Sequence, residues 1–127
     1  MHDSNHPAFA RPLVNQARSA IRAGQYDQAV MLLQSSHPAA SRDGFAWNLL
    51  GVAHECRKEW KQARHCYGKA MLADPALNAP QQNLRRIYEL FTFSRSNEAI
   101  ALGDHELLLR RHLETSLMKR RPVSTPI

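Results

Sequence analysis

The sequence has few of the residues that build disulfide frameworks, sheets and membrane spans. Of its 127 residues only two are cysteine and five are glycine, and no apolar run approaches the length of a membrane span. No stretch alternates apolar and polar residues as a strand does, and the N-terminus lacks the features of a secretory signal. These absences favour a single all-α domain in a reducing, cytoplasmic environment.

The charge balance is basic. Seventeen Lys and Arg residues against eleven Asp and Glu give a net charge of +6, and thirteen of the seventeen are Arg. Such a surface can attract nucleic acid, an acidic protein segment or an anionic membrane, but net charge alone selects none of these partners. Solvated helix faces in a basic protein are the plainer explanation of the excess.

Apolar positions at helical spacing divide the chain into successive helices. Asp43 is the expected N-cap of one of them and Asn78 of another. The tail from Ser96 to Arg121 is also helical in pattern, with a break at Gly103 and a new cap at Asp104. The earlier helices are expected at about residues 8–23, 27–36, 44–57, 60–73 and 78–93.

Two stretches of the sequence align when one is shifted by thirty-four residues. "GQYDQAVMLLQ" (24–34) then matches "KEWKQARHCYG" (58–68), and Ala29 falls on Ala63. A helix–turn–helix unit that recurs with a period of 20–50 residues is typical of a stacked repeat array.

The clearest copy of this unit begins at Trp47. Its anchors are Trp47, Leu50, Gly51, Ala63, Tyr67, Ala70 and Asp74-Pro75. This copy resembles the tetratricopeptide signature W-x2-L-G…A-x3-F/Y-x2-A…P, with His54 where the family usually carries Tyr. Gly51 and Ala63 are small where two antiparallel helices must approach closely. The first copy is weaker, and the third begins correctly at Leu84 but has Arg85 at the position of Gly51.

The resemblance, which extends from Leu13 to Leu102, implies an all-α fold of antiparallel helical hairpins, stacked as a short right-handed array. The expected divisions are a flexible N-terminus (1–7), repeats (8–103, with units at about 10–43, 44–77 and a degenerate 78–103), a C-terminal amphipathic helix (104–121) and a flexible tail (122–127). We favour the helix at 104–121 as a cap on the array, because a terminal repeat needs a polar outer side. Its leucines 109, 113 and 117 would alternatively form a homodimer contact.

Tetratricopeptide proteins are non-catalytic scaffolds that bind peptides or partner helices in a concave groove, lined by the first helix of each repeat. Arginine offers a fork to carboxylates, and asparagine offers a donor and an acceptor to an extended backbone. The resemblance therefore implies an acidic or C-terminal peptide, or a partner's helix, as ligand. Carried over position by position, the groove would be lined by Arg11, Asn15, Arg18 and Arg22, then Asn48, Val52 and Glu55, then Gln82, Asn83 and Arg86.

The clamp of Lys and Asn with which some family members hold a C-terminal carboxylate is not reproduced. Val14 and Arg18 stand at its positions in the first repeat, and Leu49 replaces the Asn of the second. We therefore do not expect the chain to bind chaperone C-termini.

Other chemistries have little support in the sequence. His54, Cys56, His65 and Cys66 share one hairpin, but their spacings match no zinc motif. No phosphate-binding glycine loop, nucleophile elbow or pair of carboxylates is present. We expect no enzymatic activity, no metal and no cofactor. Two alternatives to the groove stay open: association of the Arg-rich C-terminal helix with nucleic acid or an anionic surface, although that helix has no stacking aromatic, and homo-oligomeric assembly.

Overall fold

The computed structural model describes residues 7–35 and 42–104, which form five helices and contain no strand. The helices are α1 (Pro7–Arg22), α2 (Tyr26–Ser35), α3 (Gly44–Cys56), α4 (Trp60–Ala73) and α5 (Ala79–Phe93). These bounds lie close to those expected from the sequence, and the all-α class is confirmed. None of these helices is long and apolar enough to cross a membrane. The expected flexible tail and the helix at 104–121, apart from Asp104, lie outside the described residues.

The ends of the helices follow from local residues. Gly24 adopts a left-handed φ of +77°, which glycine tolerates without a Cβ penalty, and it ends α1. Asp43 caps α3 as expected, because its side chain accepts a hydrogen bond from the N–H of Phe45 at 2.9 Å. Asn78 stands at the cap position of α5 but makes no capping hydrogen bond with its side chain.

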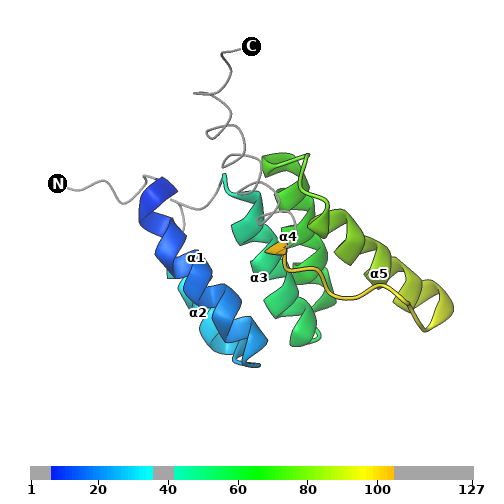
Figure 1. Cartoon of the computed structure of the whole chain (residues 1–127). Helices are drawn as coiled ribbons and strands as arrows, with labels where there is room; N and C mark the ends of the chain where they lie inside the picture. The colour runs from blue at the N-terminus through cyan, green and yellow to red at the C-terminus, as the bar shows by residue number, and fades with distance from the viewer. Residues whose placement is uncertain (1–6, 36–41, 105–127) are drawn as a thin grey trace, which may run out of the picture.

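The hairpin of α3 and α4 depends on a close contact between Gly51 and Tyr67. A Cβ added to Gly51 would lie 2.5 Å from Cε1 of Tyr67, so only glycine fits here. Ala63 and Tyr67 are fully buried beside this contact. In the hairpin of α1 and α2, Ala17 and Ala29 are fully buried in the same way. The hairpins stack through α2 against α3 and α4 against α5, which gives the array in Figure 1.

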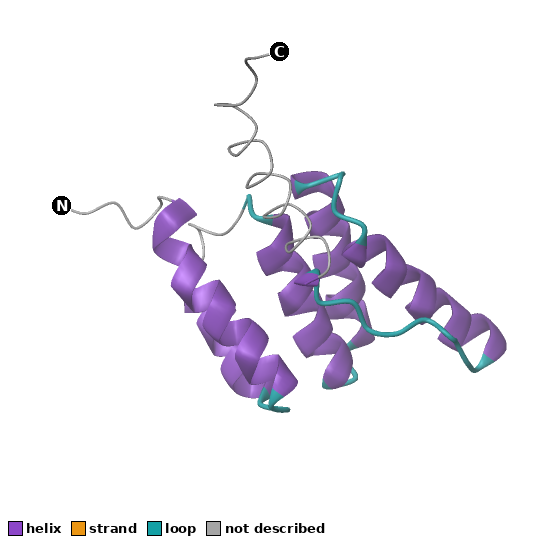
Figure 2. Ribbon diagram, in the orientation of Figure 1, coloured by secondary structure: helices purple, strands orange, loops and turns teal. Residues whose placement is uncertain are grey.

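The chain after α5 differs from the prediction. Ser94, with a left-handed φ of +63°, ends α5, and residues 95–102 leave the helical conformation and run back across α3 (Figures 1 and 2). The helical pattern expected from Ser96 onward is therefore wrong as far as Leu102. The physical reason is that backbone groups of this stretch bond to side chains of α3 and α5 instead of to one another. We call residues 95–104 the return segment.

The third hairpin consequently lacks its second helix within the described residues. Two aromatic side chains of α5, Tyr88 and Phe91, remain 63% and 59% exposed. The rings of Phe91 and of Trp60 on α4 meet edge to face, with centroids 5.5 Å apart. Within the described residues, α5 therefore has no helical partner that follows it in the chain.

Candidate functional site

Most of the predicted groove residues lie on one face, built from α1, α3 and α5, and the return segment runs along that face (Figure 1). We call it the α1–α3–α5 face. The side chains on it that contact the return segment are Arg18, Arg22, Asn48, Gln82, Asn83 and Arg86.

Two buried asparagines bind the backbone of Ala101. Nδ2 of Asn83 donates to the carbonyl oxygen of Ala101 at 2.8 Å, and the N–H of Ala101 donates to Oδ1 of Asn83 at 2.8 Å. Nδ2 of Asn48 donates to the same carbonyl at 2.9 Å. Nδ2 of Asn83 also donates to Oδ1 of Asn48, which fixes the orientation of both amides. Both side chains are fully buried, so this pairing leaves their main donors and acceptors satisfied.

The backbone of Ala99 is bound in the same manner two residues earlier. Nε2 of Gln82 and Nη1 of Arg86 each donate to its carbonyl oxygen at 2.9 Å. Ile100, between the two bound residues, is 43% exposed. The carbonyl groups of residues i and i+2 point to the same side of an extended chain, so the face binds main-chain groups with a period of two.

Arg86 is held in place by a buried ion pair. Its Nε donates to Oε2 of Glu55 at 2.9 Å, and its Nη2 donates to Oε1. The hydroxyl of Tyr67 donates to Oε1 of Glu55 at 2.6 Å. Burial, with the Glu55 carboxylate beside it, raises the pKa of Tyr67. The guanidinium fork that the sequence offers to a ligand carboxylate is therefore occupied by Glu55, and only Nη1 of Arg86 faces the return segment.

A carboxylate is bound instead at the α1 end of the face. Nε of Arg18 lies 3.0 Å from Oδ1 of Asp104, and Nη2 of Arg22 pairs with Oδ2. Asn15 supports Arg18, since its Oδ1 accepts a hydrogen bond from Nη1 of Arg18 at 3.0 Å. The side chain of Arg18 is only 9% exposed, whereas that of Arg22 is 53% exposed. Two guanidinium groups around one carboxylate make a charge-assisted anion site.

Leu102 and Gly103 join the backbone-binding part of the face to this anion site. Leu102 packs against the hydrophobic core. Gly103 is buried with a φ of +85°, and a Cβ there would lie 3.0 Å from Cδ1 of Phe45. Sequence reasoning missed Phe45 as a residue of the site and gave Gly103 only the role of a helix break.

Three predicted groove residues do not contact the return segment, and a fourth cannot be placed. Glu55 pairs with Arg86 and Tyr67 instead. Val52 is fully buried in the core. Asn15 is exposed and acts through Arg18. Arg11 lies in α1, but its side chain is outside the described ones.

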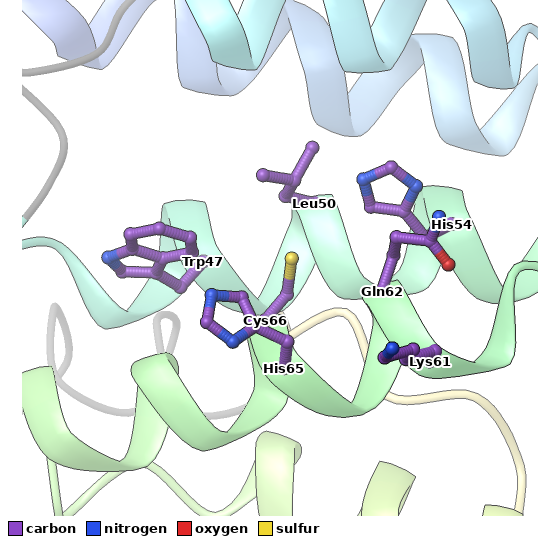
Figure 3. Close-up of a pocket in the computed structure, with 7 residues that line it drawn as sticks. All are labelled: Trp47, Leu50, His54, Lys61, Gln62, His65 and Cys66. Atoms are coloured by element: carbon purple, nitrogen blue, oxygen red, sulfur yellow. The ribbon is translucent and has the colours of Figure 1, made fainter.

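A separate pocket of about 520 Å³ lies along α3 and α4 (Figure 3). Aromatic rings and a thiol are prominent among the side chains that line it. The rings of Trp47 and His65 meet edge to face with centroids 6.4 Å apart, and Nδ1 of His54 hydrogen-bonds Oε1 of Glu59 at 2.6 Å. Burial raises the pKa of the Cys66 thiol to about 12, so it is not a nucleophile at neutral pH. The lining residues are Trp47, Leu50, His54, Lys61, Gln62, His65 and Cys66. Among residues 7–35 and 42–104, no three His, Cys, Asp or Glu side chains gather as metal ligands.

One comparison with known proteins finds a similarity. The tetratricopeptide repeat family model matches residues 44–77. This range spans α3, α4 and the connection to α5, the hairpin in which the family signature is clearest. No curated protein and no solved structure is significantly similar to the chain. Residues 44–77 are therefore similar to a tetratricopeptide repeat, as the sequence pattern predicts.

Proposed function

We propose that this chain, which is similar to a tetratricopeptide repeat over residues 44–77, is a non-catalytic scaffold that binds an extended, acidic segment of a partner protein on its α1–α3–α5 face. Tetratricopeptide repeats generally mediate protein–protein interaction, so the class of function follows from the family. We propose in addition which face of the chain binds the partner and that the bound segment is extended and acidic.

The observation that carries the proposal is the way the face holds the chain's own return segment. Asn48 and Asn83 bind main-chain groups, which every peptide has. Arg18 and Arg22 bind a carboxylate, which only an acidic residue or a C-terminus has. Main-chain contacts supply affinity for an extended peptide, while the two arginines select its charge.

The proposal also includes a cytoplasmic environment and leaves two alternative functions open. The two cysteines within the described residues, Cys56 and Cys66, are free thiols, which agrees with a reducing cytoplasm. Binding of nucleic acid through the Arg-rich C-terminal helix and homodimer formation remain secondary alternatives. Their residues lie outside the described ones, and the arginines of the α1–α3–α5 face are paired with Glu55 and Asp104.

The test is a selection of random peptides by display on the intact chain, followed by measurement of their affinities. We expect the selected peptides to share an acidic residue. On the Asp104→Asn chain, in which no carboxylate of residue 104 occupies the two arginines, the substitutions Arg18→Gln/Arg22→Gln should lower the affinity at least about tenfold, since hydrogen bonds to charged groups contribute about 1.5–3 kcal/mol.

The matched control is Arg64→Gln/Lys69→Gln, which removes two cations from exposed positions of α4. It should bind the selected peptides as the wild type does. Peptides without acidic residues, or an equal loss of affinity in both variants, would contradict the proposed site.

A further inference from the structure

We propose that the return segment is an internal copy of the ligand: the partner segment carries the same pattern of residues, takes the same positions on the face and displaces residues 95–104. This inference rests on the proposed function and deepens it, because it specifies the sequence of the ligand and the step that binding requires.

The contacts of the return segment define a pattern residue by residue. The position of Ala101 must donate its N–H to Oδ1 of Asn83, which excludes proline. The next position, that of Leu102, must be apolar because it packs against the core. Ile100 is exposed, so its position accepts many side chains.

The last two positions are the most selective. At Gly103 the positive φ and the 3.0 Å approach of a Cβ to Phe45 require glycine. At Asp104 the two guanidinium groups require a carboxylate. The ligand pattern is thus a non-proline residue, an apolar residue, glycine, and Asp or Glu.

Displacement is feasible because the return segment is attached by exchangeable contacts. Its backbone is bound by side chains of the face, and a second extended chain would offer the same carbonyl and N–H groups. The close contacts within the hairpins, such as that between Gly51 and Tyr67, do not involve it. Ser94, where the segment leaves α5, already holds a left-handed backbone that is unfavourable for serine.

Competition between the two segments has a measurable consequence. A peptide that binds in place of the return segment has its apparent affinity reduced by the fraction of molecules in which the face is free. A substitution that weakens the contacts of the return segment, but leaves the face unchanged, should therefore raise the affinity of the chain for the peptide.

The experiment measures the affinity of the intact chain for an amidated, fluorescently labelled peptide RSNEAIALGD, the sequence of residues 95–104. Two variants weaken the return segment: Gly103→Ala, which brings a Cβ against Phe45, and Asp104→Asn, which removes the carboxylate from Arg18 and Arg22. We expect each to bind the peptide at least about tenfold more tightly than the wild type does. The control Ile100→Thr, at an exposed position of the same segment, should bind as the wild type does.

A second peptide, RSNEAIALGN, should bind the wild type and both variants more weakly than RSNEAIALGD does, because it lacks the carboxylate that Arg18 and Arg22 bind. Equal affinity of the wild type and both variants for RSNEAIALGD would overturn the displacement. If the wild type and both variants bound the peptide equally, but Arg18→Gln/Arg22→Gln did not bind it, the proposed function would stand while the inference failed. If neither the wild type nor any variant bound the peptide, the inference would be overturned. The proposed function would then be tested by the peptide selection alone.

Discussion

Asn83 and Ala101 exchange two hydrogen bonds of 2.8 Å, one in each direction, between a side-chain amide of α5 and the backbone of a segment eighteen residues later. The asparagine thereby pairs with the peptide group as a neighbouring strand would. The pairing accounts for two features together: it takes residues 95–102 out of the helix that their sequence favours, and it shows how the α1–α3–α5 face can hold an extended peptide.

Replacing Asn83 should loosen the return segment. In Asn83→Ala the N–H of Ala101 loses its acceptor, and Oδ1 of Asn48 loses its donor. We expect faster amide hydrogen exchange at Ala101 and a loss of about 1–3 kcal/mol in the free energy of unfolding. The control Gln81→Ala, at an exposed position of the same helix, should change neither. Unchanged protection of Ala101 in Asn83→Ala would show that this pairing does not hold the segment.

Gly51 and Gly68, in the hairpin of α3 and α4, should respond oppositely to alanine. Gly51→Ala places a Cβ 2.5 Å from the ring of Tyr67 and should destabilise the protein by about 1–3 kcal/mol. Gly68→Ala, in α4, meets nothing within 4 Å and should stabilise it by about 0.5–1 kcal/mol through helix propensity. Urea unfolding of the two variants measures both changes, and equal effects would contradict the close packing of α3 on α4.

Glu55 should be needed to keep Arg86 in the interior. Glu55→Gln leaves a guanidinium that is 6% exposed without its counter-charge, which we expect to cost about 3–5 kcal/mol. The control is the same substitution at Glu98, whose partner Arg85 is 55% exposed; there the loss should stay below about 1 kcal/mol. Comparable losses at the two positions would mean that Arg86 is solvated in solution.

Burial of Cys66 should make the protein less stable at alkaline pH. Burial raises the pKa of this thiol from 9.0 to about 12, so between these values the unfolded chain loses the proton while the folded chain keeps it. The unfolded state then binds fewer protons, and the free energy of unfolding falls as pH rises. At pH 10.5 this loss is at most about 2 kcal/mol relative to neutral pH. Tyr67, whose pKa is also raised, adds to the loss above its usual pKa of 10.0.

Comparison of the wild type with Cys66→Ala isolates the thiol, because Tyr67 is present in both. The difference between their unfolding free energies at pH 7.5 and 10.5 should change by up to about 2 kcal/mol. If both proteins lose the same stability, Cys66 is not held protonated by burial.

The sequence predicts the helices and the face more completely than it predicts what lies on the face. The thirty-four-residue register places Asn83 and Arg86 on the first helix of their repeat, because the helical period decides which positions share a side. The helical period does not predict the path of residues 95–102. Their Glu, Ala and Leu residues favour helix, and the extended conformation depends on Asn48 and Asn83, which are distant in sequence.

The role of Arg86 shows the same limit. Spacing places both Arg86 and Glu55 on the predicted groove, and each alone suggests a charge available to a ligand. Only the structure shows that they neutralise one another, since their pairing depends on how α3 and α5 pack. The anion site is formed by Arg18 and Arg22 instead.

The measurement that tests this account most directly is amide hydrogen exchange at Ala101 while the intact chain is saturated with the peptide RSNEAIALGD. Its N–H is bound to Asn83 in the free protein. If a ligand takes the place of the return segment, exchange at Ala101 should accelerate on binding, while exchange of the α3 and α4 backbone stays slow. Protection of Ala101 that persists at saturation would contradict the account, because the peptide would then be bound elsewhere.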